Sequence, residues 1–207
     1  ASQTIGEYFL PKYIGKFKEL YPQVEIAIEV FNTQHIVKSV NDQLLDIGLV
    51  EGHVENEGLN IVPFLDDELM VIVNPNHPLA HQKSVTFDQL SLFPFILREK
   101  GSGTRQIMEE ALVKTGHDGD SLSIIMELGS TEAVKSAVEA NLGISILSKR
   151  TVQKELQFKT LKALKIEDIV IMRKFYVITN PKKYLSPPME HFLTFISEEK
   201  EVNILNG

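Results

Sequence analysis

The chain has 207 residues, which is enough for one large domain or two small ones. Its 43% hydrophobic and 24% charged residues exclude an intrinsically disordered or fibrous protein. The absence of cysteine excludes a disulfide scaffold, a thiol nucleophile and a zinc site built on sulfur. The net charge of −7 argues against a chain that itself binds nucleic acid or an acidic membrane.

No apolar run approaches the roughly 18 residues that a membrane span needs. The start of the sequence also lacks the basic region and apolar run of a secretory signal. We therefore expect a soluble, cytoplasmic protein that makes no contact with a membrane.

The first quarter of the sequence alternates helix and strand patterns. Apolar residues at helical spacing predict a helix over Ile5–Leu20, and strict alternation predicts a strand over Val24–Val30. Asn32 and Thr33 then open a predicted helix that runs to Leu45. The segment Asp46–Val50 follows as a short buried strand.

A long run of β-formers occupies Leu59–Val73 and contains the acidic residues Asp66–Glu68. We interpret it as two strands that are separated at this acidic turn. The cluster Asn74–Pro78 ends the second strand.

The same alternation then restarts and continues to the end of the sequence. The expected helices are Thr86–Leu90, Gly101 through Val113, Thr131–Ala140 and Pro187–Glu199, and the expected strands are Phe93–Leu97, Leu122–Leu128, Ile144–Leu147, Phe158–Leu164 and Phe175–Thr179. Such alternation indicates an α/β protein with a mostly parallel, doubly wound sheet. Two such blocks on either side of a turn cluster suggest two similar lobes.

Four of the predicted helices begin with hydroxyl or amide residues. Helix starts carry unpaired N–H groups and about half a positive charge, so several of them at the carboxyl ends of strands can bind an anion without a lysine. The alternative is that these residues only cap their helices, since Ser, Thr and Asn are preferred caps. The candidate residues are Ser2, Thr4, Thr33, Ser102, Thr104, Ser130 and Thr131.

Other kinds of chemistry find little support. The loop Gly101–Arg105 lacks the lysine of a Walker loop, although Arg98, Lys100 and Arg105 could supply countercharge to a small anion. The six histidines form no metal-ligand pattern, GxSxG is absent, and Asp66–Glu68 is typical of a surface turn. We therefore expect no catalytic residue, no metal and no cofactor.

Several motifs in order along the chain resemble one known family. They are SQTIGEYFLPKYIGKFKELYP, DIGLVEG, NPNHPLA, REKGSGTR and ELGSTEAVKSAVEANLGISILS, which together cover Ser2 to about Ile196. HPLA and VEANLGISILS are the most specific of them. The chain resembles the effector-binding domain of LysR-type transcriptional regulators, and most closely those that govern sulfur or nitrogen assimilation.

The resemblance implies a two-lobe fold of the type II periplasmic-binding-protein kind with two crossovers and a small anionic effector in the cleft. Residues 1–74 with 148–207 would form lobe I, and 75–147 would form lobe II. A winged helix-turn-helix, absent from this sequence, would precede the chain in the longer protein and would be its contact with DNA. In such domains the anionic group is commonly held by the turn after the first strand, here Ser2 and Thr4, with the other candidate residues on facing turns.

The resemblance also implies a homodimer that pairs the first helix of one subunit with a strand of the other. Binding of the effector would favour one closure of the lobes and so change the packing of the effector domains. Two rival functions stay open: a solute-binding protein of a transporter with the same fold, and an enzyme on this fold. The enzyme would need an acid, base or nucleophile at the cleft, where the sequence offers hydroxyls and amides.

Overall fold

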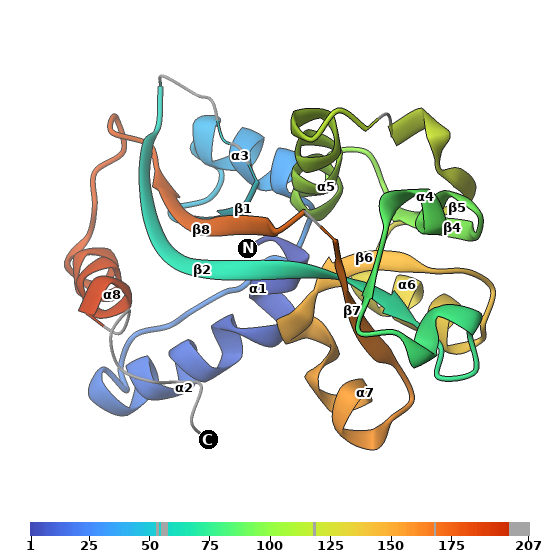
Figure 1. Ribbon diagram of the computed structural model, residues 1–207. Coiled ribbons are helices and arrows are strands. Elements are labelled where there is room, and N and C mark those ends of the chain that lie inside the picture. Colours follow the sequence, from blue (N-terminus) through green and yellow to red (C-terminus); the bar gives the residue numbers. More distant parts are fainter. Residues whose placement is uncertain (53, 55–57, 118, 168, 199–207) are drawn as a thin grey trace. The chain divides into compact units, whose positions relative to one another are not determined.

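A computed structural model describes residues 1–52, 54, 58–117, 119–167 and 169–198 (Figure 1). The chain forms two compact units, which we call unit 1 (Ala1–Asp66 and the segment from Lys174 onward) and unit 2 (Asp67–Arg173). The sequence predicted lobe boundaries at 74–75 and 147–148, whereas the two compact units change at 66–67 and 173–174. The segment with α7 (Gln153–Phe158) and β7 (Lys162–Ile166), predicted for lobe I, belongs to unit 2.

Unit 1 begins with two short helices where the sequence predicted one. These are α1 (Gln3–Tyr8) and α2 (Leu10–Leu20), which are separated at Phe9 and have Pro11 in the first turn of α2. A proline is compatible with that first turn but not with a continuous helix interior. The helices α3 (Thr33–Asn41) and α8 (Pro187–Glu198) agree with prediction, although α3 ends four residues before Leu45.

The helices α2 and α8 of unit 1 lie side by side (Figure 1). An aromatic cluster packs between them. The ring of Phe17 lies 5.1 Å from that of Phe192 and 5.5 Å from that of Phe195, and Phe17 is fully buried. Edge-on ring pairs of this kind add stabilisation beyond the area that they bury. The apolar stripe of α2 is therefore used within unit 1 itself.

The predicted strand at Val24–Val30 is wrong. This segment has no regular secondary structure, and Ile26 and Ile28 are exposed. The nearest pairing is a single parallel bridge between Ser2 and Phe31. An alternating pattern makes a segment suitable for a sheet, but a strand also needs a hydrogen-bonding neighbour along its length.

The strand β1 (Gly48–Glu51) pairs antiparallel with β8 (Ile171–Thr179), with Gly48 opposite Ile178 and Glu51 opposite Phe175. Gly48 is needed there, because a Cβ atom would lie 2.6 Å from Cγ1 of Ile178. This pairing places the end of β1, with Glu51, beside the starts of α1 and α3.

The sequence Leu59–Val73 proves to be one continuous strand, β2 (Asn60–Val73), so the predicted break at Asp66–Glu68 is wrong. Residues 60–66 of β2 belong to unit 1 and residues 67–73 to unit 2. The end of β2 pairs antiparallel with β6 (Ser145–Ser148) and with β7. Only β3 (Ser84–Val85) joins this part of the sheet parallel, through β7, among the described pairs. The expectation of a mostly parallel sheet is therefore wrong for the strands around β2.

The predicted strand Phe158–Leu164 is only partly correct, because Phe158 ends α7 and β7 begins at Lys162. The other parts of unit 2 follow the predicted alternation. The strands β4 (Pro94–Arg98) and β5 (Ser123–Leu128) pair in parallel and are followed by α5 and α6, respectively. The helices are α4 (Phe87–Ser91), α5 (Gly103–Lys114) and α6 (Thr131–Glu139), and the short 3-10 turns are η1 (Pro78–His81), η2 (Gly119–Ser121) and η3 (Lys149–Val152).

Each unit has its own hydrophobic core. In unit 1 one cluster is built around Phe17, Phe175 and Ile196 and a second around Ile36 and Ile178. The two clusters of unit 2 centre on Phe95 and Ile96, which point from β4 in opposite directions. Among the described residues, no helix is both long and apolar enough to cross a membrane.

Candidate functional site

The candidate hydroxyls of unit 1 gather around Glu51, a residue that the sequence argument did not select. The Ser2 hydroxyl donates to the Glu51 carboxylate, and the Thr33 hydroxyl donates to the Glu51 backbone carbonyl at 2.8 Å. All three residues are buried. The first turns of α1 and α3 thus meet a buried negative charge at the end of β1.

This geometry determines what the unit 1 hydroxyls can still do. A hydroxyl has one proton to donate, and Ser2 and Thr33 use theirs on Glu51. They can accept a hydrogen bond from a ligand more readily than they can donate one to an anion. Thr4 lies in the same first turn of α1 and is buried.

The start of α5 in unit 2 has a different character. Gly101 turns the chain with φ +87°, Ser102 is the N-cap residue and Thr104 lies in the first turn. The Ser102 side chain makes no cap hydrogen bond, although the residue is only 3% exposed. The Thr104 hydroxyl accepts a hydrogen bond of 2.9 Å from Nη1 of Arg173.

Arg173 belongs to a buried network at the end of unit 2. Its Nε donates to Oδ2 of Asp67 at 2.7 Å, and neither side chain is exposed. The other carboxylate oxygen of Asp67 accepts from the Ser148 hydroxyl at 2.8 Å and lies 3.7 Å from Nε of Arg150. Two guanidinium groups therefore face one carboxylate.

The start of α6 combines a cap with a second arginine. The Ser130 hydroxyl accepts from the Ala133 N–H at 3.1 Å, which is the structural role that capping predicts. The Thr131 hydroxyl accepts from Nη1 of Arg98 at 2.8 Å. Arg98 also makes two hydrogen bonds with Glu99, so Glu99 offsets its charge.

The countercharge expected from Arg98, Lys100 and Arg105 is thus only partly present. Arg98 is buried and reaches a candidate threonine, while Lys100 is exposed. Arg105 forms ion pairs with Glu109 and Glu127. Burial alone would lower the pKa of Arg105, but its hydrogen bonds to these two carboxylates raise it above its usual range.

The sequence argument missed Glu51, Asp67 and Arg173. A signal for Arg173 was present just before the predicted strand Phe175–Thr179: it alternates with Ile171 and Phe175, and in β8 these three residues share one buried face. A charge on a core-facing position needs a buried partner. The partner itself could not be identified, because Asp67 was assigned to a surface turn.

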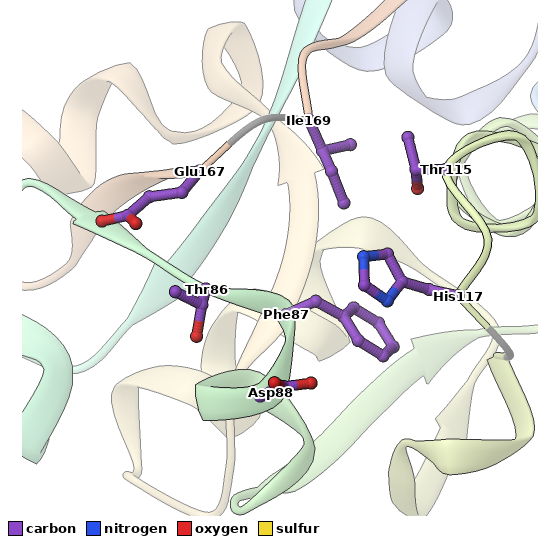
Figure 2. A pocket seen from close by; sticks show the side chains of 7 residues that line it. All are labelled: Thr86, Phe87, Asp88, Thr115, His117, Glu167 and Ile169. Atoms are coloured by element: carbon purple, nitrogen blue, oxygen red, sulfur yellow. The ribbon is translucent and has the colours of Figure 1, made fainter.

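A cavity of about 380 Å³ lies elsewhere in unit 2 and is lined by none of the seven candidates (Figure 2). Phe87 and His117 stack in it with their ring centroids 4.2 Å apart, and Asp88 and Glu167 bring carboxylates to its wall. Its acidic lining makes it unsuited to an anion. Within the described ranges, no group of three or more His, Asp or Glu side chains could hold a metal ion.

Comparison with known proteins identifies the family. The sequence profile described as the LysR substrate binding domain matches residues 1–201. The chain therefore belongs to the LysR substrate-binding domain family, a non-enzymatic family of transcriptional regulators. This decides against an enzyme and disfavours the transporter alternative.

Individual relatives agree with this assignment. The HTH-type transcriptional regulator YeiE of Escherichia coli K12 is 40% identical over 195 residues, which cover 94% of this chain and 65% of YeiE. A probable RuBisCO transcriptional regulator of Emiliania huxleyi is 36% identical over 205 residues, which cover 98% of this chain and 63% of that protein. The chain thus spans less than two thirds of the length of these relatives.

Solved structures give the fold. The regulatory domain of Synechocystis PCC6803 CcmR, in complex with 2-PG, has a TM-score of 0.87 and 33% identity, and the match covers 98% of this chain and 95% of that one. The effector-binding domain of QuiR, in complex with shikimate, has a TM-score of 0.83 and 23% identity, with 96% and 93% covered. The predicted α/β fold of the two-lobe type II periplasmic-binding-protein kind is confirmed.

Proposed function

We propose that the chain is the effector-sensing part of a LysR-type transcription factor and that it binds a small anionic metabolite through the polar starts of its helices. The observation that carries this proposal is the burial of hydroxyls at those starts: six of the seven candidates, all except Ser130, are buried. Four of these hydroxyls, those of Ser2, Thr33, Thr104 and Thr131, are oriented at the helix starts by hydrogen bonds with Glu51, Arg173 and Arg98, which supports a preformed polar site. The candidates in unit 1 are Ser2, Thr4 and Thr33, and those in unit 2 are Ser102, Thr104, Ser130 and Thr131.

The chemistry of the effector follows from relatives and from the resemblance to regulators of sulfur or nitrogen assimilation. CcmR was solved with 2-PG (2-phosphoglycolate) and QuiR with shikimate, and both ligands are small anions. For this chain we propose an effector of that size and charge, drawn from sulfur or nitrogen metabolism. In the longer protein a helix-turn-helix domain would contact DNA in the cytoplasm, and the effector would change the DNA-bound state.

Thermal melting of the purified chain tests the sensor function. The probes are sulfate, sulfite, thiosulfate, phosphate, O-acetylserine, small dicarboxylates, 2-phosphoglycolate and shikimate. A true ligand at 100 times its Kd adds about 2.7 kcal/mol of stability and raises Tm by several degrees. A flat response across the whole panel would contradict the proposal of a small anionic effector.

Variants separate binding from folding in the same assay. Thr4→Ala and Thr33→Ala are expected to lose most of the stabilisation by ligand. Without ligand, Thr33→Ala should lower Tm only by the loss of its hydrogen bond to the Glu51 carbonyl. Ser197→Ala is the matched control, because its hydroxyl only bonds the Thr194 carbonyl on the surface of α8. Equal losses of Tm with and without ligand in the threonine variants would point to a structural role alone.

We also propose a homodimer through the effector domains. Exposed apolar side chains support it in each unit: Ile26 and Ile28 in unit 1, and Ile124 and Ile125 on β5 in unit 2. Sedimentation equilibrium of Ile28→Lys and Ile125→Lys should show a weakened dimer, whereas Leu92→Lys, also at an exposed apolar position, should not. Dimers of unchanged stability in the first two variants would overturn this interface.

A further inference from the structure

The cavity of unit 2 shown in Figure 2 lies outside the proposed effector site, because none of the seven candidate hydroxyl residues lines it. It has a volume of about 380 Å³, and three segments of the chain meet in it: α4 with its N-cap residue, the end of α5, and the stretch after β7. All three segments belong to unit 2, so this compact unit forms the cavity by itself.

Hydrogen bonds and a ring contact hold the three segments together. The Glu167 N–H donates to the Val85 carbonyl, and the Ser84 hydroxyl donates to Oε1 of Glu167, both at 2.8 Å. On the other side, the ring of His117 stacks on that of Phe87 with the centroids 4.2 Å apart. The segment before α4 is thus tied to the stretch after β7, and α4 itself to the end of α5. The lining residues are therefore held in a preformed arrangement.

One wall of the cavity is apolar (Figure 2). Phe87 and Ile169 belong to it, and each is only 7% exposed. The ring of His117 covers Phe87 at an angle of 28° between the two planes. Such a wall favours methylene groups of a ligand, because apolar surface that packs against it is removed from water.

The polar groups of the lining are mainly hydrogen-bond acceptors. Asp88 and Glu167 supply two carboxylates, and both residues are exposed. The Thr115 hydroxyl donates its proton to the Ala111 and Leu112 carbonyls, so its oxygen can only accept from a ligand. Among the described residues that line the cavity there is no lysine or arginine. This lining favours a ligand that donates hydrogen bonds and carries positive charge.

The two carboxylates differ from others of unit 2 in lacking a countercharge. Glu109 and Glu127 form ion pairs with Arg105. In the part of the chain that the structure describes, neither Asp88 nor Glu167 forms an ion pair with a basic side chain. Two unpaired negative charges on separate segments, on either side of one cavity with an apolar wall, can be neutralised by a ligand with two positive charges.

The ring of His117 is a further unused group at this wall. Within the described ranges neither of its ring nitrogens forms a hydrogen bond, although the ring is half-buried against Phe87. A neutral imidazole has one acceptor nitrogen, so it can accept from an ammonium group that a carboxylate also contacts. Together the ring pair and the carboxylates match a molecule with an apolar middle and cationic ends.

We propose that this cavity is a second ligand site, which binds a short aliphatic diamine with its two ammonium groups at Asp88 and Glu167 and its methylene chain along the apolar wall. The inference does not depend on the proposed effector site, which takes an anion and is built from other residues. Because exposed ion pairs contribute little, we expect a Kd in the millimolar range.

The test is a ¹⁵N–¹H NMR titration of the 207-residue chain with putrescine, cadaverine and hexamethylenediamine, which differ in the length of the methylene chain. The expected result is a saturable shift of the Asp88, His117 and Glu167 amide signals with at least one diamine. The monoamine with the same number of carbons should bind about threefold more weakly or worse, because it leaves one carboxylate unpaired. The corresponding diol should cause no saturable shift.

Three variants locate the binding site. Asp88→Asn and Glu167→Gln each remove one charge with little change in shape, and each should raise the Kd of the best diamine about threefold. Glu139→Gln is the matched control, because it removes the same charge from an exposed residue of unit 2 that does not line the cavity, and it should leave Kd nearly unchanged. All three positions are exposed, so the amide spectra without ligand should show folded proteins.

Two results would overturn the inference. Shifts that do not saturate, or that Glu139→Gln weakens as much as Asp88→Asn does, would mean that diamines only screen the negative surface of the chain. A monoamine that binds as tightly as the diamine would mean that the two carboxylates do not act together. Neither result would affect the proposed function, whose anionic ligands are tested separately by the melting panel.

Discussion

Asp67 and Arg173 form an ion pair of 2.7 Å in which neither side chain is exposed to solvent. They are the first and last residues of unit 2, so the pair joins the two places where the chain enters and leaves that unit. At the adjacent sequence positions, which belong to unit 1, Asp66 and Lys174 form an ion pair of 3.0 Å with both side chains more than half exposed. Both are ion pairs between an aspartate and a basic residue, but the first is buried and the second is exposed to solvent.

This difference in burial predicts that removing the negative charge of Asp67 lowers the free energy of unfolding far more than removing that of Asp66. Asp67→Asn should lower the free energy of unfolding by about 3–5 kcal/mol, because it leaves the Arg173 charge buried without its partner. Asp66→Asn should cost no more than about 1 kcal/mol, because water already solvates both members of its pair. Urea unfolding of the two variants measures the difference. Similar midpoints for both would show that the burial of Asp67 does not matter for stability.

The two N-cap serines of unit 2 form a second matched pair. Ser130→Ala should destabilise the chain by about 1 kcal/mol, because the Ser130 hydroxyl caps α6 through the Ala133 N–H. Ser102→Ala removes a hydroxyl that caps nothing and should leave the free energy of unfolding nearly unchanged or slightly higher. Thermal melting without ligand compares the two directly. A loss at Ser102 as large as that at Ser130 would mean that the Ser102 hydroxyl has a structural partner.

The sequence predicted most helices and strands of unit 2 because strong caps, turns and apolar periods agree there, as at Thr86, whose side chain forms a capping box with Gln89. It failed at Val24–Val30 and at Asp66–Glu68 for opposite reasons. The first segment has the pattern of a strand but lacks a neighbour along its length. The second has the composition of a turn but continues a strand, because Arg173 and Ser148 compensate the buried Asp67.

The candidate site was also predicted only in part. Its hydroxyls could be found because a helix start has a local signature in the sequence. The charged groups that give each hydroxyl its role come from distant strands: Glu51 is 18 residues from Thr33, and Arg173 is 69 residues from Thr104. Such partners follow from tertiary structure, so the sequence could predict the polar helix starts but not the charged residues that contact them.

Two glycines in helical and strand positions predict opposite changes in stability. At Gly15 in α2 a Cβ atom would meet nothing within 4 Å, so Gly15→Ala should add about 0.5–1 kcal/mol by reducing the entropy of the unfolded chain. At Gly48 in β1 a Cβ atom would lie 2.6 Å from Ile178 and 2.9 Å from Ile36, so Gly48→Ala should cost about 1–3 kcal/mol. Chemical unfolding measures the change in the free energy of unfolding for both variants. Stabilisation by Gly48→Ala would contradict the close packing of β1.

His77 predicts a dependence of stability on pH. Burial lowers the pKa of His77 below its ordinary value of 6.5, and its Nδ1 accepts a hydrogen bond from the Leu79 N–H, which requires the neutral ring. The folded chain therefore binds the His77 proton more weakly than the unfolded chain does. The stability that this residue contributes is present above pH 6.5 and is lost as the pH falls through the lowered pKa of the folded state.

The measurement is Tm between pH 7.5 and 5 for the parent chain and for His77→Asn. Asparagine can accept the same N–H bond and does not titrate, so the variant should lose less stability on acidification than the parent chain. His81→Asn, at an exposed position one turn further on, is the control and should follow the parent profile. Parallel profiles for the parent chain and His77→Asn would show that His77 takes up its proton equally in the folded and unfolded states.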